Sequence, residues 1–311
     1  MKLAERGGVK DGVRQTSRQT RVSRDKLKCG KLSTRAPIPR NFLRAYKRYN
    51  NKVFSGALYH EDATDFLRSI EKNTADIVFL DPPFNIGKKY DGSSKSDRLP
   101  DSDYELWLHT IFDESIRVVK PGGALYLYHL PKWAMRFGRY LEQHLEFRHW
   151  ISVSMKGGFA RGNRLYPAHY ALLYFTDGAP GYFVRPKLTP ATCRHCGGTI
   201  KDYGGYKKII DTKGLNLSDV WDDLSPVRHN HRKNRVQNEL PKKFMERIIE
   251  ISGPQGGVYV DPFAGGGTGV IEAIQGRMHF LACDKMEENG AIIAERLEGL
   301  KRGKHGEKTI A

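Results

Sequence analysis

The chain has 311 residues, of which 39% are hydrophobic, and a formal net charge of +17. That length suits one α/β domain with an insertion, or two small domains. No apolar run approaches the roughly 20 residues of a membrane-spanning helix, and the first residues are too polar for a signal peptide, so we expect a soluble cytoplasmic protein with no membrane partner.

Positive charge is concentrated at the start of the chain. Residues 1–50 hold 15 Lys and Arg against 3 Asp and Glu, which accounts for +12 of the total +17 and leaves +5 for the rest. Such an arm suits a polyanion, because neutralised phosphates release counterions; a solvated tail is the alternative. Residues 1–40 lack apolar periodicity and are expected to be disordered when free. Residues 41–50 are expected to form a short basic helix.

From residue 53 onward, apolar residues follow strand and helix periods. Strands are predicted at 53–59, 76–80, 124–129, 149–155, 170–175, 257–260 and 278–283. Helices are predicted at 63–71, 104–119, 133–144, 241–252, 268–275 and 287–300. Their alternation predicts an α/β, doubly wound, Rossmann-like sheet. The rhythm breaks in the middle, which divides the chain into a basic arm (1–50), a first half-domain (51–176), an insert (177–235) and a second half-domain (236–311).

A glycine-rich loop follows the predicted strand at 257–260, with the sequence Asp261-Pro262-Phe263-Ala264-Gly265-Gly266-Gly267-Thr268-Gly269. In an open parallel sheet, ligands bind beyond the carboxyl ends of the strands, and glycines let the backbone approach them closely. The loop is neither G-x-G-x-x-G nor a P-loop, because Val270 stands at the third glycine and no lysine follows.

Asp284 lies at the end of the next predicted strand, about 20 residues beyond the loop, where an acid binds a ribose diol. The loop and the acid together predict a nucleoside ligand without a pyrophosphate, and S-adenosylmethionine fits that description. A purely structural glycine turn is the alternative.

A second turn, Asp81-Pro82-Pro83-Phe84, follows the predicted strand at 76–80. Prolines fix φ and lack N–H groups, while their carbonyl oxygens stay free to accept hydrogen bonds. The Asp81 carboxylate and the Pro82 carbonyl could each accept one hydrogen of an exocyclic base amine, and Phe84 could stack on that base once it is flipped out of the duplex. A strand-ending turn with a buried aromatic ring is the alternative.

DPPF at 81–84 and DPFAGGGTG at 261–269 together resemble the motifs of the amino-methyltransferase family that makes N6-methyladenine and N4-methylcytosine in DNA. The resemblance covers residues 53–300. The catalytic motif comes first, as in the circularly permuted β group of that family, whose target-recognition region lies between the two motifs. The chain departs from many members at 238–241, where Asn-Glu-Leu-Pro replaces T-x-K-P.

The resemblance implies a site-specific DNA methyltransferase that uses S-adenosylmethionine and base flipping. It implies catalysis by Asp81, Pro82, Pro83 and Phe84. It implies cofactor binding by residues of the glycine loop and of two acidic positions, namely Asp62, Asp261, Phe263, Ala264, Gly265, Gly267, Thr268 and Asp284. Aspartate as the first residue of DPPF favours adenine N6, and cytosine N4 is the alternative.

Double-stranded DNA is the partner that the resemblance implies, in a prokaryotic or phage-encoded system. A homodimer and a restriction endonuclease partner are both left open. Methylation of RNA is a competing hypothesis. A non-catalytic nucleic-acid-binding zinc module is another, although it gives neither motif a role.

The insert contains Cys193 and Cys196, whose C-x-x-C spacing suits one side of a zinc site. No second C-x-x-C follows, so a zinc half-site and a turn with two free thiols are both open, and no metal ligand is assigned. A basic run follows at 228–235. It is predicted to contact DNA through Arg228, His231, Arg232, Lys233 and Arg235.

Overall fold

The computed structural model describes residues 47–50, 54–87, 97–154, 162–163, 165–190, 192–193, 195–198, 203–224 and 239–301. Its strands are β1 (Lys47–Asn50), β2 (Ser55–His60), β3 (Ala75–Leu80), β4 (Val119–His129), β5 (Glu146–Ser154), β6 (His169–Thr176), β7 (Lys187–Leu188), β8 (Leu215–Asn216), β9 (Val220–Trp221), β10 (Val258–Asp261) and β11 (His279–Asp284). Its helices are α1 (Ala63–Ser69), α2 (Asp101–Val118), α3 (Pro131–Leu141), α4 (Lys207–Lys213), α5 (Lys242–Ser252), α6 (Thr268–Gln275) and α7 (Glu287–Lys301), with a 3₁₀ turn, η2, at Tyr203–Gly205.

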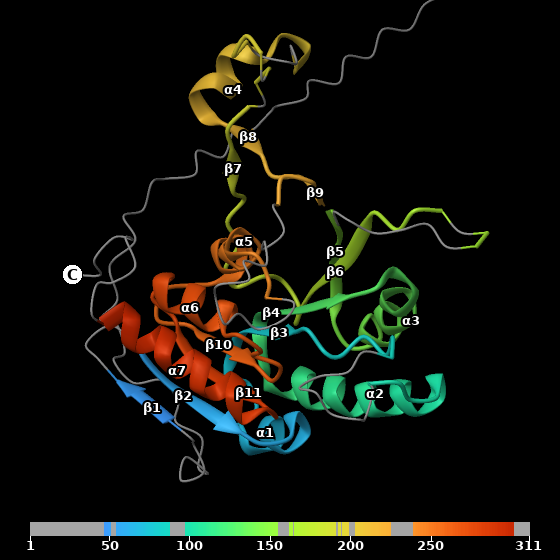
Figure 1. The fold of residues 1–311 in the computed structure, drawn as a ribbon. Coiled ribbons are helices and arrows are strands. Elements are labelled where there is room, and N and C mark those ends of the chain that lie inside the picture. Colours follow the sequence, from blue (N-terminus) through green and yellow to red (C-terminus); the bar gives the residue numbers. More distant parts are fainter. Residues whose placement is uncertain are drawn as a thin grey trace, which may run out of the picture. The chain divides into compact units, whose positions relative to one another are not determined.

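One nine-stranded sheet has the order β1-β2-β11-β10-β3-β4-β6-β5-β9 (Figure 1). Its centre, from β2 through β11, β10 and β3 to β4, is parallel. The strand β6 then pairs antiparallel with both β4 and β5. The middle strand, β3, and its neighbour β10 come from opposite halves of the chain, and their pairing joins the two halves into one sheet.

Helices cover both faces of the sheet (Figure 1). On β3, Ile77 and Phe79 pack in the cluster that includes residues of α5, α6 and α7. The intervening Val78 and Leu80 pack in the cluster that includes residues of α1, α2 and α3. All four side chains are at most 1% exposed. The strand is therefore apolar throughout because both of its faces are covered, as expected for a central parallel strand.

The sequence-based prediction of an α/β, doubly wound sheet is confirmed, and each strand and helix predicted between residues 53 and 300 has its counterpart within a few residues. The expected helix at 41–50 is wrong for its last four residues, which form β1 antiparallel to β2. Tyr49 explains the difference, because its buried ring packs 5.9 Å from that of Phe280. Residues 1–46, the rest of the basic arm, lie outside the described residues.

Within 177–235, β7 and β8 form a two-stranded antiparallel sheet, and η2 and α4 lie between them in the sequence. No residue of α4 is buried. Further on, β9 joins the edge of the main sheet parallel to β5. The division of the chain at residues 176 and 235 stays a prediction.

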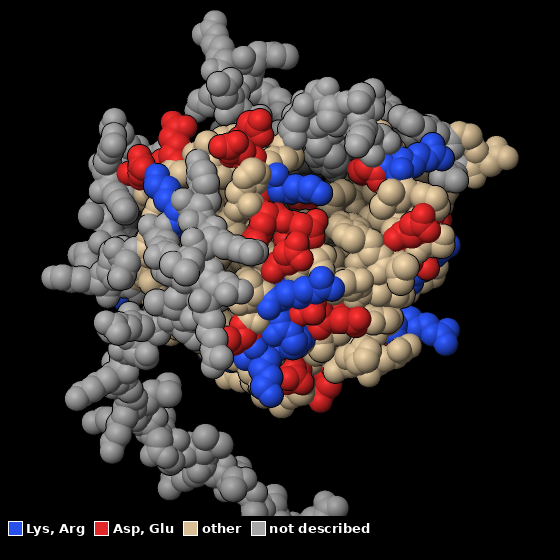
Figure 2. Space-filling model, turned by 90° about the horizontal axis from the view of Figure 1, so that it is seen from below, with Lys and Arg blue, Asp and Glu red and all other residues tan. Residues whose placement is uncertain are grey.

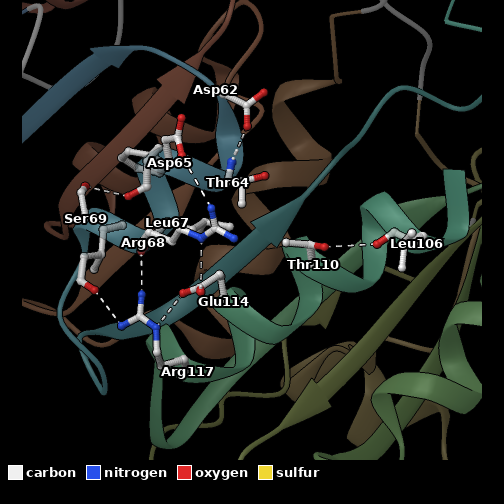
Figure 3. A network of polar contacts seen from close by, with 12 residues as sticks. Asp62, Thr64, Asp65, Leu67, Arg68, Ser69, Leu106, Thr110, Glu114 and Arg117 are labelled. Carbon is white, nitrogen blue, oxygen red and sulfur yellow. Dashed lines mark hydrogen bonds and ion pairs between the residues drawn. The ribbon is translucent and has the colours of Figure 1, made fainter. Parts of the chain in front are cut away.

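Arg117, near the end of α2, ties that helix to α1 (Figure 3). Its guanidinium donates to the main-chain oxygens of Leu67 and Ile70, at 2.8 Å each, and to Glu114 at 2.7 Å. Carbonyl groups at the end of a helix lack intrahelical donors, and a cation there also suits the helix dipole. Arg117 thus fixes α1, and with it the turn after β2, against the sheet.

Charged side chains of both signs are interspersed over the face that Figure 2 shows, with no large patch of one sign among its described residues. Ion pairs of this mixed kind also join α2 and α3, where Lys132 lies 2.8 Å from Asp101 and Arg136 pairs with Glu105. The strongly basic stretches of the sequence lie mostly outside the described ranges. No helix within those ranges is long and apolar enough to cross a membrane.

Gly56 provides a test of the register between β2 and β11. It lies opposite Phe280 in the sheet, and a Cβ atom at Gly56 would stand 2.1 Å from Cε1 of that buried ring. We expect Gly56→Ala to lower the free energy of unfolding by about 1–3 kcal/mol, the usual cost of overpacking a core. Urea denaturation measures this change.

Gly138→Ala is the matched control, because a Cβ atom there meets only Cδ1 of Leu173 at 3.4 Å. Alanine is favoured over glycine inside a helix such as α3, so this variant is expected to be neutral or up to about 1 kcal/mol more stable. Equal effects of the two alanines would contradict the packing described for Phe280.

Candidate active site

Acidic residues gather where four neighbouring strands end. Asp81 follows β3, Asp261 ends β10, Asp284 ends β11 and Asp62 comes two residues after β2. Because these strands are parallel and adjacent, their carboxyl ends meet at one edge of the sheet, where ligands bind in open α/β folds. The structure thus brings the DPPF turn and the glycine loop, far apart in the sequence, to neighbouring positions.

The glycine loop makes a tight connection between β10 and α6. Gly267 has φ of 76° at the N-cap of α6, and a Cβ atom there would stand 2.6 Å from Ile293 of α7. The N–H of Gly267 donates to the Ala264 oxygen at 2.7 Å, and the N–H of Ala264 donates to the Cys283 oxygen at 2.9 Å. Glycine at 267 is therefore required both by its positive φ and by the close approach of α7.

Gly265 differs from Gly267 in what surrounds it. Its φ is 49°, but the nearest atom to a Cβ placed there would be the Phe263 oxygen at 4.0 Å. Packing does not exclude a side chain at Gly265, so the space beside the loop is available to a ligand. This space, the acids of the neighbouring strand ends and the N-terminus of α6 fit the nucleoside and the charged amino-acid group of S-adenosylmethionine.

Asp261 is buried beneath the loop, with 3% of its surface exposed. It accepts hydrogen bonds from the Tyr259 hydroxyl at 2.8 Å and from the N–H of Phe263 at 3.1 Å. Burial raises the pKa of Asp261 to about 7, against the effect of these two donors and with a further contribution from the charge of Asp284. Asp261, which was predicted to bind the cofactor, therefore holds the glycine loop from its buried side, through the N–H of Phe263.

Asp284 and Asp62 organise the two outer strand ends. The Asp284 carboxylate accepts from the N–H groups of Gly265 and Met286, at 2.8 and 2.9 Å, and from the Asn289 side chain at 3.0 Å. These bonds use three of its roughly four acceptor positions, which leaves capacity for a ribose hydroxyl. Asp62 caps α1 by accepting from the N–H of Thr64 at 2.9 Å (Figure 3).

Two further residues hold the glycine loop, and the sequence analysis did not assign them. Arg296 of α7 donates to the Gly266 oxygen and pairs with Glu239 at 2.7 Å. Glu239 also accepts from the Thr268 hydroxyl at 3.2 Å. Glu239 stands in the segment where the chain departs from the T-x-K-P of many family members, and that departure was the only signal for it. Thr268, one of the residues predicted to bind the cofactor, thus contacts Glu239 through its hydroxyl.

Aromatic rings surround the DPPF turn. The half-buried ring of Phe84 stacks on His129 at 4.8 Å between centroids and lies 6.0 Å from Tyr128 and 5.7 Å from Tyr170. Burial, and after it the negative charge of Asp81, raises the pKa of Tyr128 and of Tyr170. The carboxylate therefore lies within electrostatic reach of both phenols, beside apolar ring surface that suits a nucleobase.

The turn is also anchored from behind by residues that sequence reasoning missed. The Tyr104 hydroxyl of α2 donates to the Pro83 oxygen and lies 2.7 Å from Nε2 of His129. His129 ends β4 at the same edge of the sheet, and its position as the last residue of a predicted buried strand was the signal that could have identified it. Nothing in the sequence marks Tyr104.

The cysteine pair forms a closed turn. The N–H of Cys193 donates to the Gly198 oxygen at 2.7 Å, the N–H of Gly197 donates to the Cys193 oxygen at 2.9 Å, and φ of Gly197 is 70°. Neighbouring N–H groups of residues 195 and 196 lower the pKa of the Cys193 thiol. Within the described ranges, no three His, Cys, Asp or Glu side chains cluster as metal ligands would. The predicted DNA-contacting residues Arg228, His231, Arg232, Lys233 and Arg235 lie outside the described residues.

Comparison with known proteins adds to this geometry. The model of a DNA methylase family, of the N6/N4 methyltransferase type, matches residues 75–295, which include both turns. The Type II methyltransferase M.BamHI of Bacillus amyloliquefaciens is 47% identical over 68% of this chain, and M.HpaI of Haemophilus parainfluenzae, another Type II methyltransferase, is 29% identical over 67%. The matched regions cover 50% and 63% of those proteins, so the chain spans only part of their length.

Among solved structures, the cytosine-N4-specific PvuII DNA methyltransferase superimposes with a TM-score of 0.57. The match covers 78% of this chain and 86% of that one, at 14% sequence identity. At this identity the likeness concerns the fold alone, and it agrees with the sheet and helix layers described above.

Filling the space at Gly265 tests the ligand position. Asparagine tolerates positive φ better than other side chains, so Gly265→Asn is expected to keep the loop while occupying the space beside it. We expect the dissociation constant for S-adenosylmethionine to rise at least about tenfold, which is about 1.4 kcal/mol. Isothermal titration calorimetry measures it.

Gly178→Asn is the matched control, because Gly178 also has positive φ, 69°, and open surroundings, but lies in the turn after β6. Both variants are expected to lose a similar, small amount of stability, whereas only Gly265→Asn is expected to lose cofactor affinity. Unchanged affinity in Gly265→Asn would contradict the proposed cofactor position.

Asp261 makes stability depend on pH. Its pKa of about 7 in the folded chain exceeds the ordinary value of 3.8, so the folded state binds a proton that the unfolded state releases between these values. The resulting stabilisation is present at low pH and is lost as pH rises through 7. Between pH 5 and 8, we expect the wild type to lose about 2.7 kcal/mol more unfolding free energy than Asp261→Asn. Urea titrations across this range measure the difference, and parallel pH profiles would contradict it.

Proposed function

The chain belongs to the N6-adenine/N4-cytosine DNA methylase family, and on that premise we propose that it transfers the methyl group of S-adenosylmethionine to adenine N6 at specific sites in DNA. The observation that carries the proposal is the pairing of β3 with β10, which sets the DPPF turn beside the glycine loop. A nucleophile held at one turn would thereby face a methyl donor held at the other.

The residues of the DPPF turn suit an exocyclic amine. The Asp81 carboxylate would accept one N–H of the amine and the Pro82 carbonyl the other, which directs the nitrogen lone pair outward. When bound, S-adenosylmethionine supplies an electrophilic methyl group on a positively charged sulfur. Asp81 would then accept the proton that the nitrogen loses on methylation, as a positioned general base. Phe84, with its exposed ring surface, would stack on the flipped base.

Adenine is the proposed base because the first residue of the motif is aspartate. A carboxylate accepts hydrogen bonds and can take up a proton, and in the family this residue favours adenine over cytosine. Cytosine N4 offers the same kind of amine, and the PvuII enzyme, with a similar fold, is cytosine-N4-specific. The chemistry of the two targets is alike, so the identity of the base is decided by the product.

Site-specific recognition is assigned to the insert and the basic segments. We propose that the basic arm at 1–50 and the run at 228–235 neutralise DNA phosphates, and that Arg228, His231, Arg232, Lys233 and Arg235 take part. The relatives M.BamHI and M.HpaI are Type II methyltransferases of bacteria. This supports a bacterial or phage origin and a restriction-modification setting, with a restriction endonuclease as the counterpart and a homodimer as the alternative to a monomer.

The test uses labelled S-adenosylmethionine and unmethylated genomic DNA, followed by digestion to nucleosides and mass spectrometry. We expect N6-methyladenine from the wild type. Asp81→Ala is expected to lower the rate of methyl transfer by at least about 10²-fold, because the amine loses its acceptor, while the dissociation constant for S-adenosylmethionine changes by less than about threefold.

Asp65→Ala is the control, since Asp65 lies on α1 with 66% of its side chain exposed. It removes a carboxylate of the same kind, and we expect unchanged transfer. N4-methylcytosine as the product would overturn the choice of base, and the absence of any methylated nucleoside would overturn the proposed reaction.

A further inference from the structure

Two prolines deprive the DPPF turn of two main-chain hydrogen-bond donors. Pro82 and Pro83 have no N–H groups, so neither can donate to a neighbouring strand or helix. At these two residues the main chain can only accept hydrogen bonds, through its carbonyl oxygens. The Pro83 oxygen accepts a hydrogen bond from the Tyr104 hydroxyl, which comes from the first turns of α2.

Tyr104 belongs to a chain of hydrogen bonds that runs in one direction. The N–H of Leu130 donates to Nδ1 of His129 at 2.8 Å, which leaves the ring proton on Nε2. Nε2 lies 2.7 Å from the Tyr104 hydroxyl, so it donates there, and the hydroxyl is left to donate to Pro83. Each group in the chain therefore has a defined role as donor or acceptor.

Burial keeps this arrangement in place. His129 is 0% exposed and Tyr104 is 1% exposed. Burial lowers the pKa of His129 to about 3, so the ring carries a single proton at neutral pH. Tyr104 is also fixed by rings, among them Trp133 at 4.8 Å. Such a chain has one stable proton arrangement and one stable geometry.

His129 also supports the turn through its ring face. Phe84 stacks on it with 4.8 Å between centroids and 28° between planes. One imidazole thus meets the turn twice, through Tyr104 at the Pro83 oxygen and directly at the Phe84 ring. The first contact is at the carbonyl of the peptide that joins Pro83 to Phe84, and the second is at the side chain of Phe84.

We propose that Tyr104 and His129 are positioning residues that hold the DPPF turn in its reactive conformation, by fixing the Pro83 carbonyl and the Phe84 ring together. They do not touch the substrate, and they act through the turn. The inference rests on the proposed methyltransferase function. Their loss lets the Pro82 carbonyl and Phe84 shift, which lowers the rate of the chemical step and leaves cofactor binding at the glycine loop unchanged.

Tyr104→Phe removes only the hydroxyl and keeps the packed ring. We expect kcat for methylation of genomic DNA to fall about 10- to 100-fold, the scale of effect when reacting groups are misplaced by about 1 Å. KM for S-adenosylmethionine is expected to stay within about threefold, and so is its dissociation constant. A purely structural role would change stability without this division between kcat and KM.

Tyr126→Phe is the matched control. Tyr126, on β4, is buried like Tyr104 but packs in the core on the other face of the sheet. Its hydroxyl is 2.7 Å from the Ser252 hydroxyl. Both variants delete one buried phenol hydroxyl, so both are expected to lose some stability. Only Tyr104→Phe is expected to lose kcat. Equal kcat values for Tyr104→Phe and the wild type, with an active wild type, would overturn the inference and leave the proposed function intact.

A second readout needs neither cofactor nor DNA. In the wild-type protein labelled with ¹⁵N-histidine, the signals of His129 are identified by their loss in His129→Gln. We expect a neutral ring with its proton on Nε2 from pH 5 to 8, and a slowly exchanging Nε2 proton that becomes fast-exchanging in Tyr104→Phe. A proton on Nδ1, or a charged ring at pH 7, would overturn the inferred chain of hydrogen bonds from His129 through Tyr104 to Pro83. A wild type that transfers no methyl group to DNA would instead overturn the proposed function.

Discussion

The parallel pairing of β3 with β10 is the contact on which the rest of the site depends. Each strand belongs to a different half of the chain, and each is followed directly by a motif-bearing turn. Because the strands are parallel and buried on both faces, their register sets where the two turns stand relative to each other. The helices on either face stabilise this arrangement, since they cover both faces of these two buried strands.

The four carboxylates at this edge of the sheet differ in burial and in hydrogen bonding, and these surroundings give them different properties. Asp284 and Asp62 each accept N–H groups of the chain that follows them, and both stay partly exposed. Asp261 is enclosed, so its charge is opposed by burial and its pKa rises to about 7. Asp81 adds its charge beside Tyr128 and Tyr170. One edge of a sheet thus holds carboxylates suited to binding, to loop support and to accepting a proton.

The sequence was sufficient for the parts of the fold that depend on local pattern. A short apolar run bounded by turn residues, such as that of β3, predicts a buried strand, and the amphipathic periods of α2 and α5 identify helices. It failed at four short, partly polar strands that exist because another strand pairs with them. The partner of β1 follows it closely in the sequence, whereas the partners of β7, β8 and β9 are distant. Motif spacing located the loop and turn residues. It could not show that Tyr104 and His129 meet behind the turn, because that contact depends on how α2 packs on β4.

The glycine loop and the DPPF turn are held in place by different kinds of hydrogen bond. This difference explains why the sequence shows which residues support the loop but not which residues support the turn. The glycine loop is rich in N–H groups, so a carboxylate such as that of Asp284 can hold it through the backbone. An acidic residue of this kind can be recognised in the sequence by its position at the end of a predicted strand. The DPPF turn has two residues without N–H groups, so at Pro82 and Pro83 its main chain can only accept hydrogen bonds, and the Pro83 oxygen accepts one from the Tyr104 hydroxyl. A turn with two adjacent prolines therefore depends on residues of a neighbouring helix and strand, where no motif marks them.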